Sequence, residues 1–135
     1  MKKWKTGMGE FVGFTVSVAC LLYIFVIFIG FAILQNGITS IEDATTMIER
    51  EIVVQESKEE AEELAEKQAK KMLSSCHNIP QNSIRTKINY AGGCKSWQKG
   101  QFGILRLRAK VKTMDPFTTK TYESHVLFMI ERNLN

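Results

Sequence analysis

Three cysteines are the most reactive side chains of this 135-residue chain, and they lie in two kinds of surroundings. Cys20 is enclosed in a long apolar run, whereas Cys76 and Cys94 flank a short segment of alternating polarity. A pair of cysteines outside the cytoplasm is a candidate disulfide. It would close a loop of about 18 residues and stabilise the fold by roughly 3 kcal/mol. We therefore predict a Cys76–Cys94 disulfide, with free thiols or intermolecular links as alternatives.

Metal binding and catalysis have little support in the sequence. His77 and His125 could join Cys76 and Cys94 in a zinc site, but the tightly spaced ligand pairs that preorganise such sites are missing. The chain also lacks the G-x-S-x-G, H-E-x-x-H and G-x-x-x-x-G-K-[ST] patterns. We expect a protein that is not an enzyme and that needs no cofactor or metal.

A basic stripe is the clearest candidate binding feature. Lysine or arginine occupies every second position in two segments of the chain, with Trp97 and Phe102 nearby. The six positions are Arg85, Lys87, Arg106, Arg108, Lys110 and Lys112. Such a surface could bind DNA backbone, an anionic cell-wall polymer or an acidic partner helix. A solvated strand face is the alternative.

Alternation of apolar and polar residues predicts three strands, at Ser83–Tyr90, Ile104–Lys112 and about Thr121–Arg132. In the second, Leu105 and Leu107 alternate with arginines. The connections at 91–101 and Asp115–Phe117 contain turn residues and allow an antiparallel meander. We therefore expect a small three-stranded antiparallel sheet with one face covered by a helix.

An uncharged run from Phe11 to Leu34 precedes these strands and follows a basic start with Lys2, Lys3 and Lys5. As a helix it would be about 36 Å long, enough to cross a hydrocarbon core of about 30 Å. The lysines place the N-terminus in the cytoplasm and the rest of the chain outside the membrane. A signal peptide usually has a shorter apolar region and a small-residue cleavage site, so we expect an uncleaved anchor.

Between the apolar run and the strands, helical spacing without proline or glycine predicts one long amphipathic helix from Ile38 to about Cys76, with Gly37 as a weak point before it. The expected order is α+β: a cytoplasmic segment (1–10), a transmembrane helix (11–34), the amphipathic helix (35–76) and the sheet (77–135).

Residues 42–66 carry ten acidic and two basic side chains, and residues 67–135 carry thirteen basic and three acidic ones. We expect these opposite charges to be complementary, within one molecule or between neighbours.

The segment Lys5-Thr6-Gly7-Met8-Gly9-Glu10-Phe11, followed by the apolar run, resembles the start of type IV pilins, and most of all that of small TadE-like pseudopilins. The resemblance implies a pilin-like fold and prepilin-type cleavage, either between Lys5 and Thr6 or after Gly7, before Met8. It also implies that the Glu10 carboxylate pairs with the freed amine of a neighbouring subunit. Solvation of Glu10 at the headgroup level is the alternative.

Two functions of different classes follow. The first is a structural, pseudopilin-like subunit of a pilus, secretion or conjugation machine, which would form homo- or hetero-oligomers in the cell membrane and extend to a surface filament. Its assembly residues would be Glu10, Phe11, Gly13, Ser17 and Ala19. The last three are small, and small side chains allow helices to pack closely in lipid. The second is a monomeric membrane-anchored module whose basic sheet face binds DNA or another polyanion.

Overall fold

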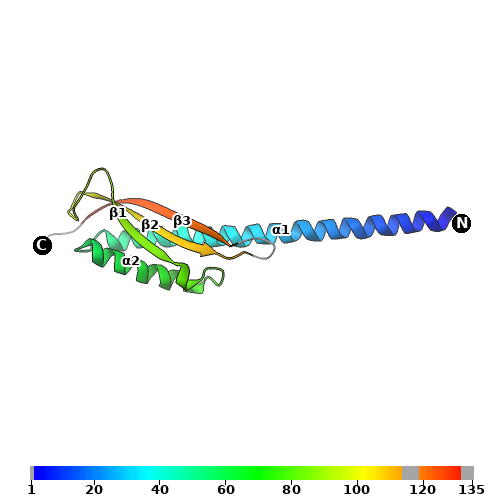
Figure 1. The fold of residues 1–135 in the computed structure, drawn as a ribbon, viewed down its shortest axis with the longest axis horizontal. Helices are drawn as coiled ribbons and strands as arrows, with labels where there is room; N and C mark the ends of the chain where they lie inside the picture. Colours follow the sequence, from blue (N-terminus) through cyan, green and yellow to red (C-terminus); the bar gives the residue numbers. More distant parts are fainter. Residues whose placement is uncertain (1, 114–118, 132–135) are drawn as a thin grey trace. The chain divides into compact units, whose positions relative to one another are not determined.

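The computed structural model describes residues 2–113 and 119–131, with side chains from residue 7 onward. The predicted turn at Asp115–Phe117 and the predicted strand end at Arg132 lie outside these residues. The elements are α1 (Lys2–Ile52), α2 (Lys58–Met72), the short 3-10 helices η1 (Leu73–Ser75) and η2 (Gln81–Ser83), β1 (Arg85–Tyr90), β2 (Phe102–Val111) and β3 (Lys120–Met129) (Figure 1). The predicted α+β class is confirmed.

The chain forms two compact units, Met1–Ala32 and Ile33–Asn135, called here the N-terminal and C-terminal units. The described part of the N-terminal unit is the first part of α1. The C-terminal unit contains the rest of α1, α2 and all three strands. The segments 35–76 and 77–135, which the sequence separates into a helix and a sheet, therefore share one compact unit.

The prediction of one uninterrupted helix from Ile38 to Cys76 is wrong, because α1 ends at Ile52 and α2 begins at Lys58. The break has its own hydrogen bonds. The Val53 carbonyl accepts from the Glu131 N–H at 2.9 Å, and the Gln55 carbonyl accepts from the Trp97 indole N–H at 2.9 Å. Backbone groups that a continuous helix would satisfy internally are thus satisfied by distant parts of the chain.

Ser57 begins the second helix. Its backbone is extended, with φ −137° and ψ 162°, and its hydroxyl accepts a hydrogen bond from the Glu60 N–H at 3.2 Å. This is the geometry of a helix N-cap, and Glu59 and Glu60 lie in the first turn, where the helix dipole favours negative charge. The sequence Ser57-x-x-Glu60 is also that of a capping box, a start signal within the segment that was predicted to be continuous.

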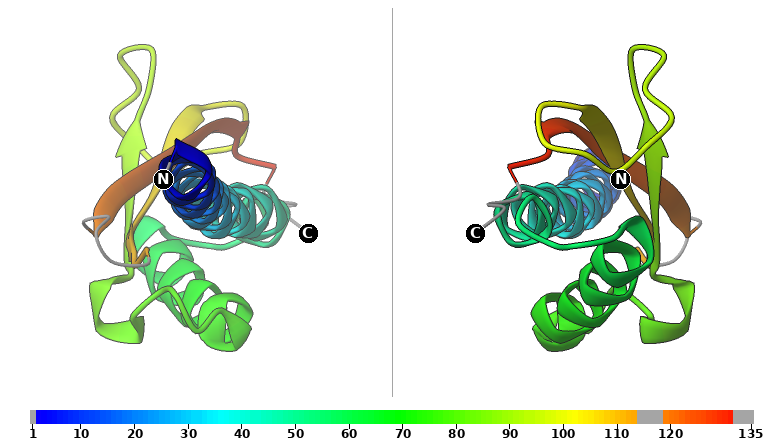
Figure 2. Two further views of the ribbon diagram at one scale, coloured as in Figure 1. Left: turned by 90° about the vertical axis from the view of Figure 1, so that its right-hand side faces the viewer. Right: turned by 90° about the vertical axis from the view of Figure 1, so that its left-hand side faces the viewer.

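The core of the C-terminal unit lies between the two helices and one face of the sheet (Figure 2). Side chains on α1 spaced three or four residues apart are fully or nearly fully buried: Ile41, Ala44, Thr45, Ile48 and Ile52. From α2 and η1 the buried side chains are Ala61, Ala65, Ala69 and Leu73. The alanines of α2 lack bulk and therefore let this helix approach the sheet closely.

The sheet is antiparallel in the order β1-β2-β3. Alternate β2 residues, among them Leu105 and Leu107, are buried under the helices, while Arg106 and Arg108 are exposed on the other face. The three predicted strands are confirmed, although β1 begins two residues later than predicted and β3 ends at Met129. Phe128 and Ile130, within the third predicted strand segment, are buried.

The free edge of β1 is covered by α2. The Glu62 carboxylate accepts a hydrogen bond from the Ile88 N–H at 3.0 Å, and the Lys58 ammonium lies 5.2 Å from the centre of the Tyr90 ring. An uncovered edge strand is a template for unwanted pairing with another chain. Here the Ile88 N–H on that edge already has its acceptor.

Gly37 lies where α1 packs against the end of β2. A Cβ atom at this position would lie 2.5 Å from the Val111 Cγ1. Nearby, the Asn78 amide donates to the Ile33 carbonyl at 3.2 Å, and the Lys112 N–H donates to the Asn78 carbonyl at 2.7 Å. Gly37 therefore serves close packing inside an unbroken helix.

Candidate functional site

The most unusual surface of the protein is the first part of α1. Large apolar side chains from Met8 to Phe31 are exposed on all sides of this helix. Only 6% of its most apolar 18-residue window is buried, and the helix is long and apolar enough to cross a membrane. No other helix among the described residues meets these two conditions.

Small residues run along one face of this helix. Gly9, Gly13 and Ser17 are spaced four residues apart and are exposed, and Glu10 lies beside them on the same side of the helix. No atom lies within 4 Å of a Cβ placed at Gly9 or Gly13. The Ser17 hydroxyl donates to the Gly13 carbonyl at 2.9 Å. This small-xxx-small pattern leaves room for a second helix to approach closely.

The other predicted residues of this segment are dispersed. Phe11 and Ala19 are exposed on other sides of the helix, away from the small-residue face. Gly7 and Met8 are exposed, and the side chains of Lys5 and Thr6 lie outside the described residues. Cleavage by a prepilin-type peptidase stays a prediction.

The strand register brings the basic residues together on the face of the sheet opposite the helices, which we call the outer face. Arg85 pairs with Arg108, and Lys87 pairs with Arg106, across β1 and β2. Lys110 follows on the same face, and Lys112 is exposed just beyond the end of β2. None of Lys87, Arg106, Arg108 and Lys110 has an ion pair among the described residues. The predicted basic stripe is therefore a continuous cluster in space.

Trp97, expected beside the basic stripe, instead stabilises the fold. Its indole N–H donates to the Gln55 carbonyl, and its ring lies 6.0 Å from that of Phe128, centre to centre, at an angle of 55°. Phe128 belongs to the buried face of the sheet. Trp97 thus fixes the loop between β1 and β2 to the break between the helices. Phe102, in contrast, is exposed on the outer face.

No family model, curated protein or solved structure matches the chain.

The predicted disulfide is wrong, because Cys76 and Cys94 are both free thiols. The Cys94 N–H donates a hydrogen bond to the Ala91 carbonyl, and the Ala91 N–H donates to the carbonyl of Phe102 at the start of β2. Cys76 lies two residues before Asn78, whose carbonyl accepts a hydrogen bond from the Lys112 N–H just beyond the other end of β2. A strand of ten residues is roughly 30 Å long, and a disulfide needs Cα atoms within about 7 Å. The two thiols lie near opposite ends of the sheet.

Metal ligands are not gathered either. No group of three or more His, Cys, Asp or Glu residues that could hold a metal ion occurs within the part of the chain that the structure describes. His125 faces outward opposite Arg106, and His77 is exposed after η1. These two histidines do not lie with the cysteines in one site.

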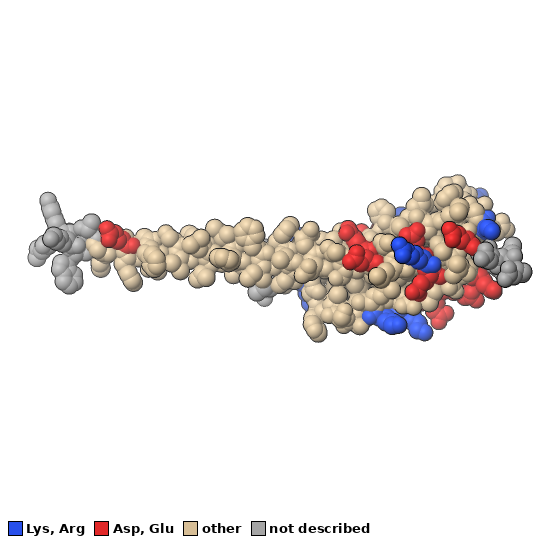
Figure 3. Space-filling view, turned by 180° about the vertical axis from the view of Figure 1, so that it is seen from behind, with Lys and Arg blue, Asp and Glu red and all other residues tan. Residues whose placement is uncertain are grey.

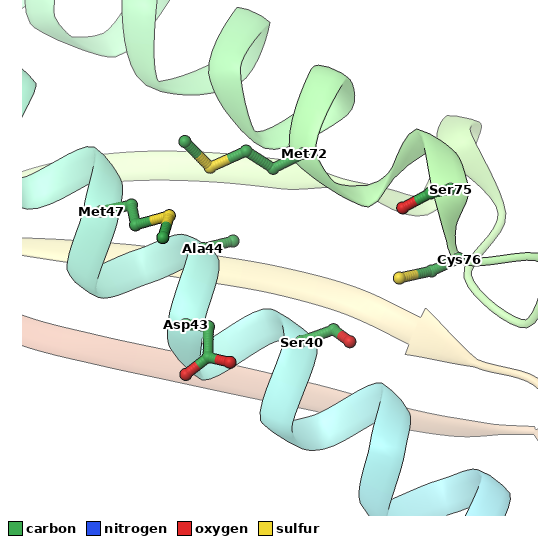
Figure 4. A pocket seen from close by; sticks show the side chains of 7 residues that line it. All are labelled: Ser40, Asp43, Ala44, Met47, Met72, Ser75 and Cys76. Atoms are coloured by element: carbon green, nitrogen blue, oxygen red, sulfur yellow. The ribbon is translucent and has the colours of Figure 1, made fainter.

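A shallow groove of about 310 Å³ separates α1 from the end of α2 (Figure 4). Met47 and Met72 face each other at one end, and Ser40, Ser75 and Cys76 lie at the other. Asp43 also lines the groove. The groove thus combines thioether, hydroxyl and thiol side chains with one carboxylate.

Two polar contacts of the C-terminal unit shift the pKa of a side chain, one within α2 and one between β3 and α1. The Lys70 ammonium, hydrogen-bonded to Glu66 at 2.7 Å, lowers the pKa of that carboxyl, and the charge of Arg85 adds a smaller effect. The Tyr122 hydroxyl donates to the Glu42 carboxylate at 2.6 Å, which raises the pKa of Tyr122. Sequence reasoning missed the second contact, because the two residues belong to different elements far apart in the chain.

Proposed function

We propose that this protein is a single-pass membrane protein that assembles with copies of itself, or with similar subunits, through its apolar N-terminal helix. The observation that carries the proposal is the exposure of large apolar side chains around this helix from Met8 to Phe31. Exposing this apolar surface to water is strongly unfavourable, whereas burying it in lipid is favourable. A helix is also suited to lipid because it satisfies its backbone hydrogen bonds internally.

The orientation follows from the charges at the two ends of the apolar run. Lys2, Lys3 and Lys5 precede it, and the first charges after it are Glu42 and Asp43. Basic residues beside a span are retained in the cytoplasm, so we propose that the C-terminal unit lies outside it. In this arrangement the apolar helix anchors a small α+β domain on the far side of the membrane.

The small-residue face supports close contact between neighbouring helices, and the resemblance to pseudopilins supports a structural role in a pilus, secretion or conjugation machine. Glu10 lies beside Gly9 and Gly13, where a second helix would pack. A carboxylate near hydrocarbon requires a partner, which a free N-terminal amine of a neighbour would provide. Such pairing would fix the stagger between subunits.

Cys20 provides a direct test, because it lies next to this small-residue face. In the full chain in native membranes, with Cys76→Ser and Cys94→Ser introduced, mild oxidation should join two copies through Cys20. The matched control moves the thiol to another side of the helix by Cys20→Ser with Leu22→Cys. Equal dimer yields from both positions, or none from either, would contradict assembly through the small-residue face.

The same membranes answer the question of processing. The intact mass and N-terminal sequence should reveal a new terminus at Thr6 or Met8 if a prepilin-type peptidase acts. An intact Met1 would instead point to a permanently anchored subunit and would remove the proposed Glu10 pairing.

The basic outer face supports a second candidate function, a membrane-anchored module that binds a polyanion. Binding of DNA or an anionic polymer through these side chains should weaken steeply as salt is raised. Assembly through the apolar helix should not, because its contacts carry little charge. Binding of the full chain to an oligonucleotide at two salt concentrations separates the two functions.

A further inference from the structure

The outer face of the sheet combines charge with exposed apolar surface. In the C-terminal unit, five large apolar side chains are exposed among the described residues, and three of them lie on this face. The register places Phe102 opposite Met129, and Ile104 opposite Leu127, at one end of β2. Arg106, Arg108 and Lys110 continue the same face along the strand. An apolar cluster flanked by cations is typical of a protein-binding surface.

The helical side of the same unit has the opposite charge. The segment 33–72 contains ten acidic and five basic residues, whereas the three strands contain six basic and one acidic. Figure 3 shows the molecule from behind, on the side away from the strands in Figure 1. Many acidic side chains lie there, with several basic ones between and below them. The exposed carboxylates of the two helices, called here the acidic helical face, are Glu42, Asp43, Glu59, Glu60 and Glu63.

Within one molecule these two faces approach each other only near the edge of the sheet, because the buried core separates the rest of them. The ion pairs found in the described part of the chain, Lys58–Glu62 and Lys70–Glu66, both lie within α2. Arg85 lies at the edge of the sheet, and its charge helps to lower the pKa of Glu66 on α2. Apart from this effect of Arg85, the charges of the outer face and of the helical face are left to meet in a second molecule.

We propose that the outer face of the sheet binds the acidic helical face of a second copy of this chain. The helical side offers matching apolar contacts, since Met47 and Val54 are the other two exposed large apolar side chains of the C-terminal unit. A polyanion fits less well, because beside Phe102 the apolar part of this face consists of Ile104, Leu127 and Met129, which give bases no surface for stacking.

The contact is heterologous, since it joins two different faces of identical chains. Contacts of this type form rings when the rotation closes and open filaments when it does not. The inference rests on the proposed assembly and adds a contact between C-terminal units to the one between apolar helices. The heterologous contact predicts that each copy binds one neighbour through the outer face of its sheet and another neighbour through its acidic helical face.

Carbodiimide cross-linking of the full chain in membranes tests this proposal. Equal amounts of heavy-isotope and light copies are reconstituted together, so that a heavy–light peptide pair reports a contact between molecules. We expect heavy–light amide links from Lys87 or Lys110 to Asp43, Glu59, Glu60 or Glu63. Links between copies that all avoid these residues would overturn the proposal.

Charge reversal sharpens the test. Arg106→Glu with Arg108→Glu should lower the heavy–light yield roughly tenfold or more, because like charges across an interface cost several kcal/mol. Glu59→Lys with Glu63→Lys should do the same, and a mixture of the two double variants should restore the links. Lys95→Glu with Lys99→Glu, an equal charge change on the exposed β1–β2 loop, is the matched control.

The Cys20 experiment keeps the two proposals distinguishable. If oxidation joins Cys20 between copies while no sheet-to-helix amide forms, the outer-face contact is overturned and assembly through the apolar helix stands. If neither link forms, both proposals fail. Salt-sensitive binding of a single-stranded oligonucleotide that Arg106→Glu with Arg108→Glu abolishes, without heavy–light amides, would assign the outer face to a polyanion and overturn the contact between copies.

Discussion

Two glycines of the C-terminal unit occupy places where a neighbouring side chain leaves no room for a Cβ atom. At Gly37 the obstacle is Val111, and at Gly103 it is the Phe128 ring, whose Cζ would lie 2.6 Å from the added atom. Phe128 is buried and packs against Trp97, so its ring cannot turn away freely. At the scale of single residues, glycine here determines how closely chain segments pack.

Gly103→Ala should therefore destabilise the protein by about 1–3 kcal/mol, the usual cost of overpacking a core. Thermal unfolding of the full chain in detergent, followed by circular dichroism, measures the effect. Gly7→Ala is the matched control, because nothing lies within 4 Å of its added Cβ. Adding Phe128→Leu to Gly103→Ala should recover part of the loss, and a melting temperature unchanged by Gly103→Ala would refute the packing argument.

Tyr122 links β3 to α1 through its hydrogen bond to Glu42, and it makes stability depend on pH. The folded state raises the pKa of Tyr122, so this contribution is fully present below the ordinary phenol pKa of about 10. It is lost as the pH rises through the higher pKa of the folded state. Because the contact is exposed, we expect Tyr122→Phe to cost about 0.5–1 kcal/mol at pH 7.

The check is chemical denaturation of both proteins at pH 7 and above pH 10. The difference between wild type and Tyr122→Phe should shrink at the higher pH, since ionised Tyr122 no longer donates to Glu42. Tyr90→Phe removes a phenol hydroxyl from another strand and is the control. A difference that stays constant across this range would rule out the proposed linkage.

At the scale of elements, alternation predicts the strands, whereas the capping sequence at Ser57 is the only local sign of the helix break. Strict alternation along β2 determines which side chains face the helices, because a strand has a period of two. The break after Ile52 contains neither glycine nor proline. It depends on Trp97 and Glu131, which satisfy the carbonyls of Gln55 and Val53 and lie 42 or more residues away in the sequence. Local patterns cannot reveal partners at that separation.

The same reason explains the two errors about side chains in the site. Cys76 and Cys94 flank one strand in the sequence, but an extended strand separates its ends instead of bringing them together. Trp97 lies near the basic residues in sequence, yet its ring packs on the buried side of the sheet, against Phe128. The basic face itself could be predicted, because it depends only on alternation and on antiparallel pairing of β1 with β2.

The N-cap at Ser57 is a local signal for the start of α2, and it leads to a prediction for the stability of this helix. Ser57→Ala should destabilise the C-terminal unit by about 1 kcal/mol, because the Glu60 N–H loses its acceptor. Ser57→Asp keeps an acceptor and should retain most of the stability. Ser96→Ala, in the exposed β1–β2 loop, is the control for removing a hydroxyl. Equal melting temperatures for Ser57→Ala and Ser57→Asp would argue against the cap.

For the whole molecule, the division into two compact units separates anchoring from folding. The buried side chains of the C-terminal unit come from residues after Ile33, whereas the apolar surface of the N-terminal unit is exposed. Changes in the first part of α1 should therefore alter membrane binding and leave the core of the C-terminal unit intact. Changes that disrupt that core should lower the unfolding temperature of the C-terminal unit and leave membrane binding intact.

Leu22→Arg with Ile24→Arg tests this independence. Each arginine near the middle of a spanning helix costs about 2.5–3.5 kcal/mol, so the double variant should appear in the soluble fraction after carbonate extraction of membranes. Its C-terminal unit should unfold at the wild-type temperature, because neither side chain belongs to its core. Gly103→Ala should behave conversely, remaining in the membrane pellet with a lower melting temperature. If the double arginine variant stayed in the pellet, the apolar helix would not be the anchor, and if its melting temperature fell, the two units would not fold independently.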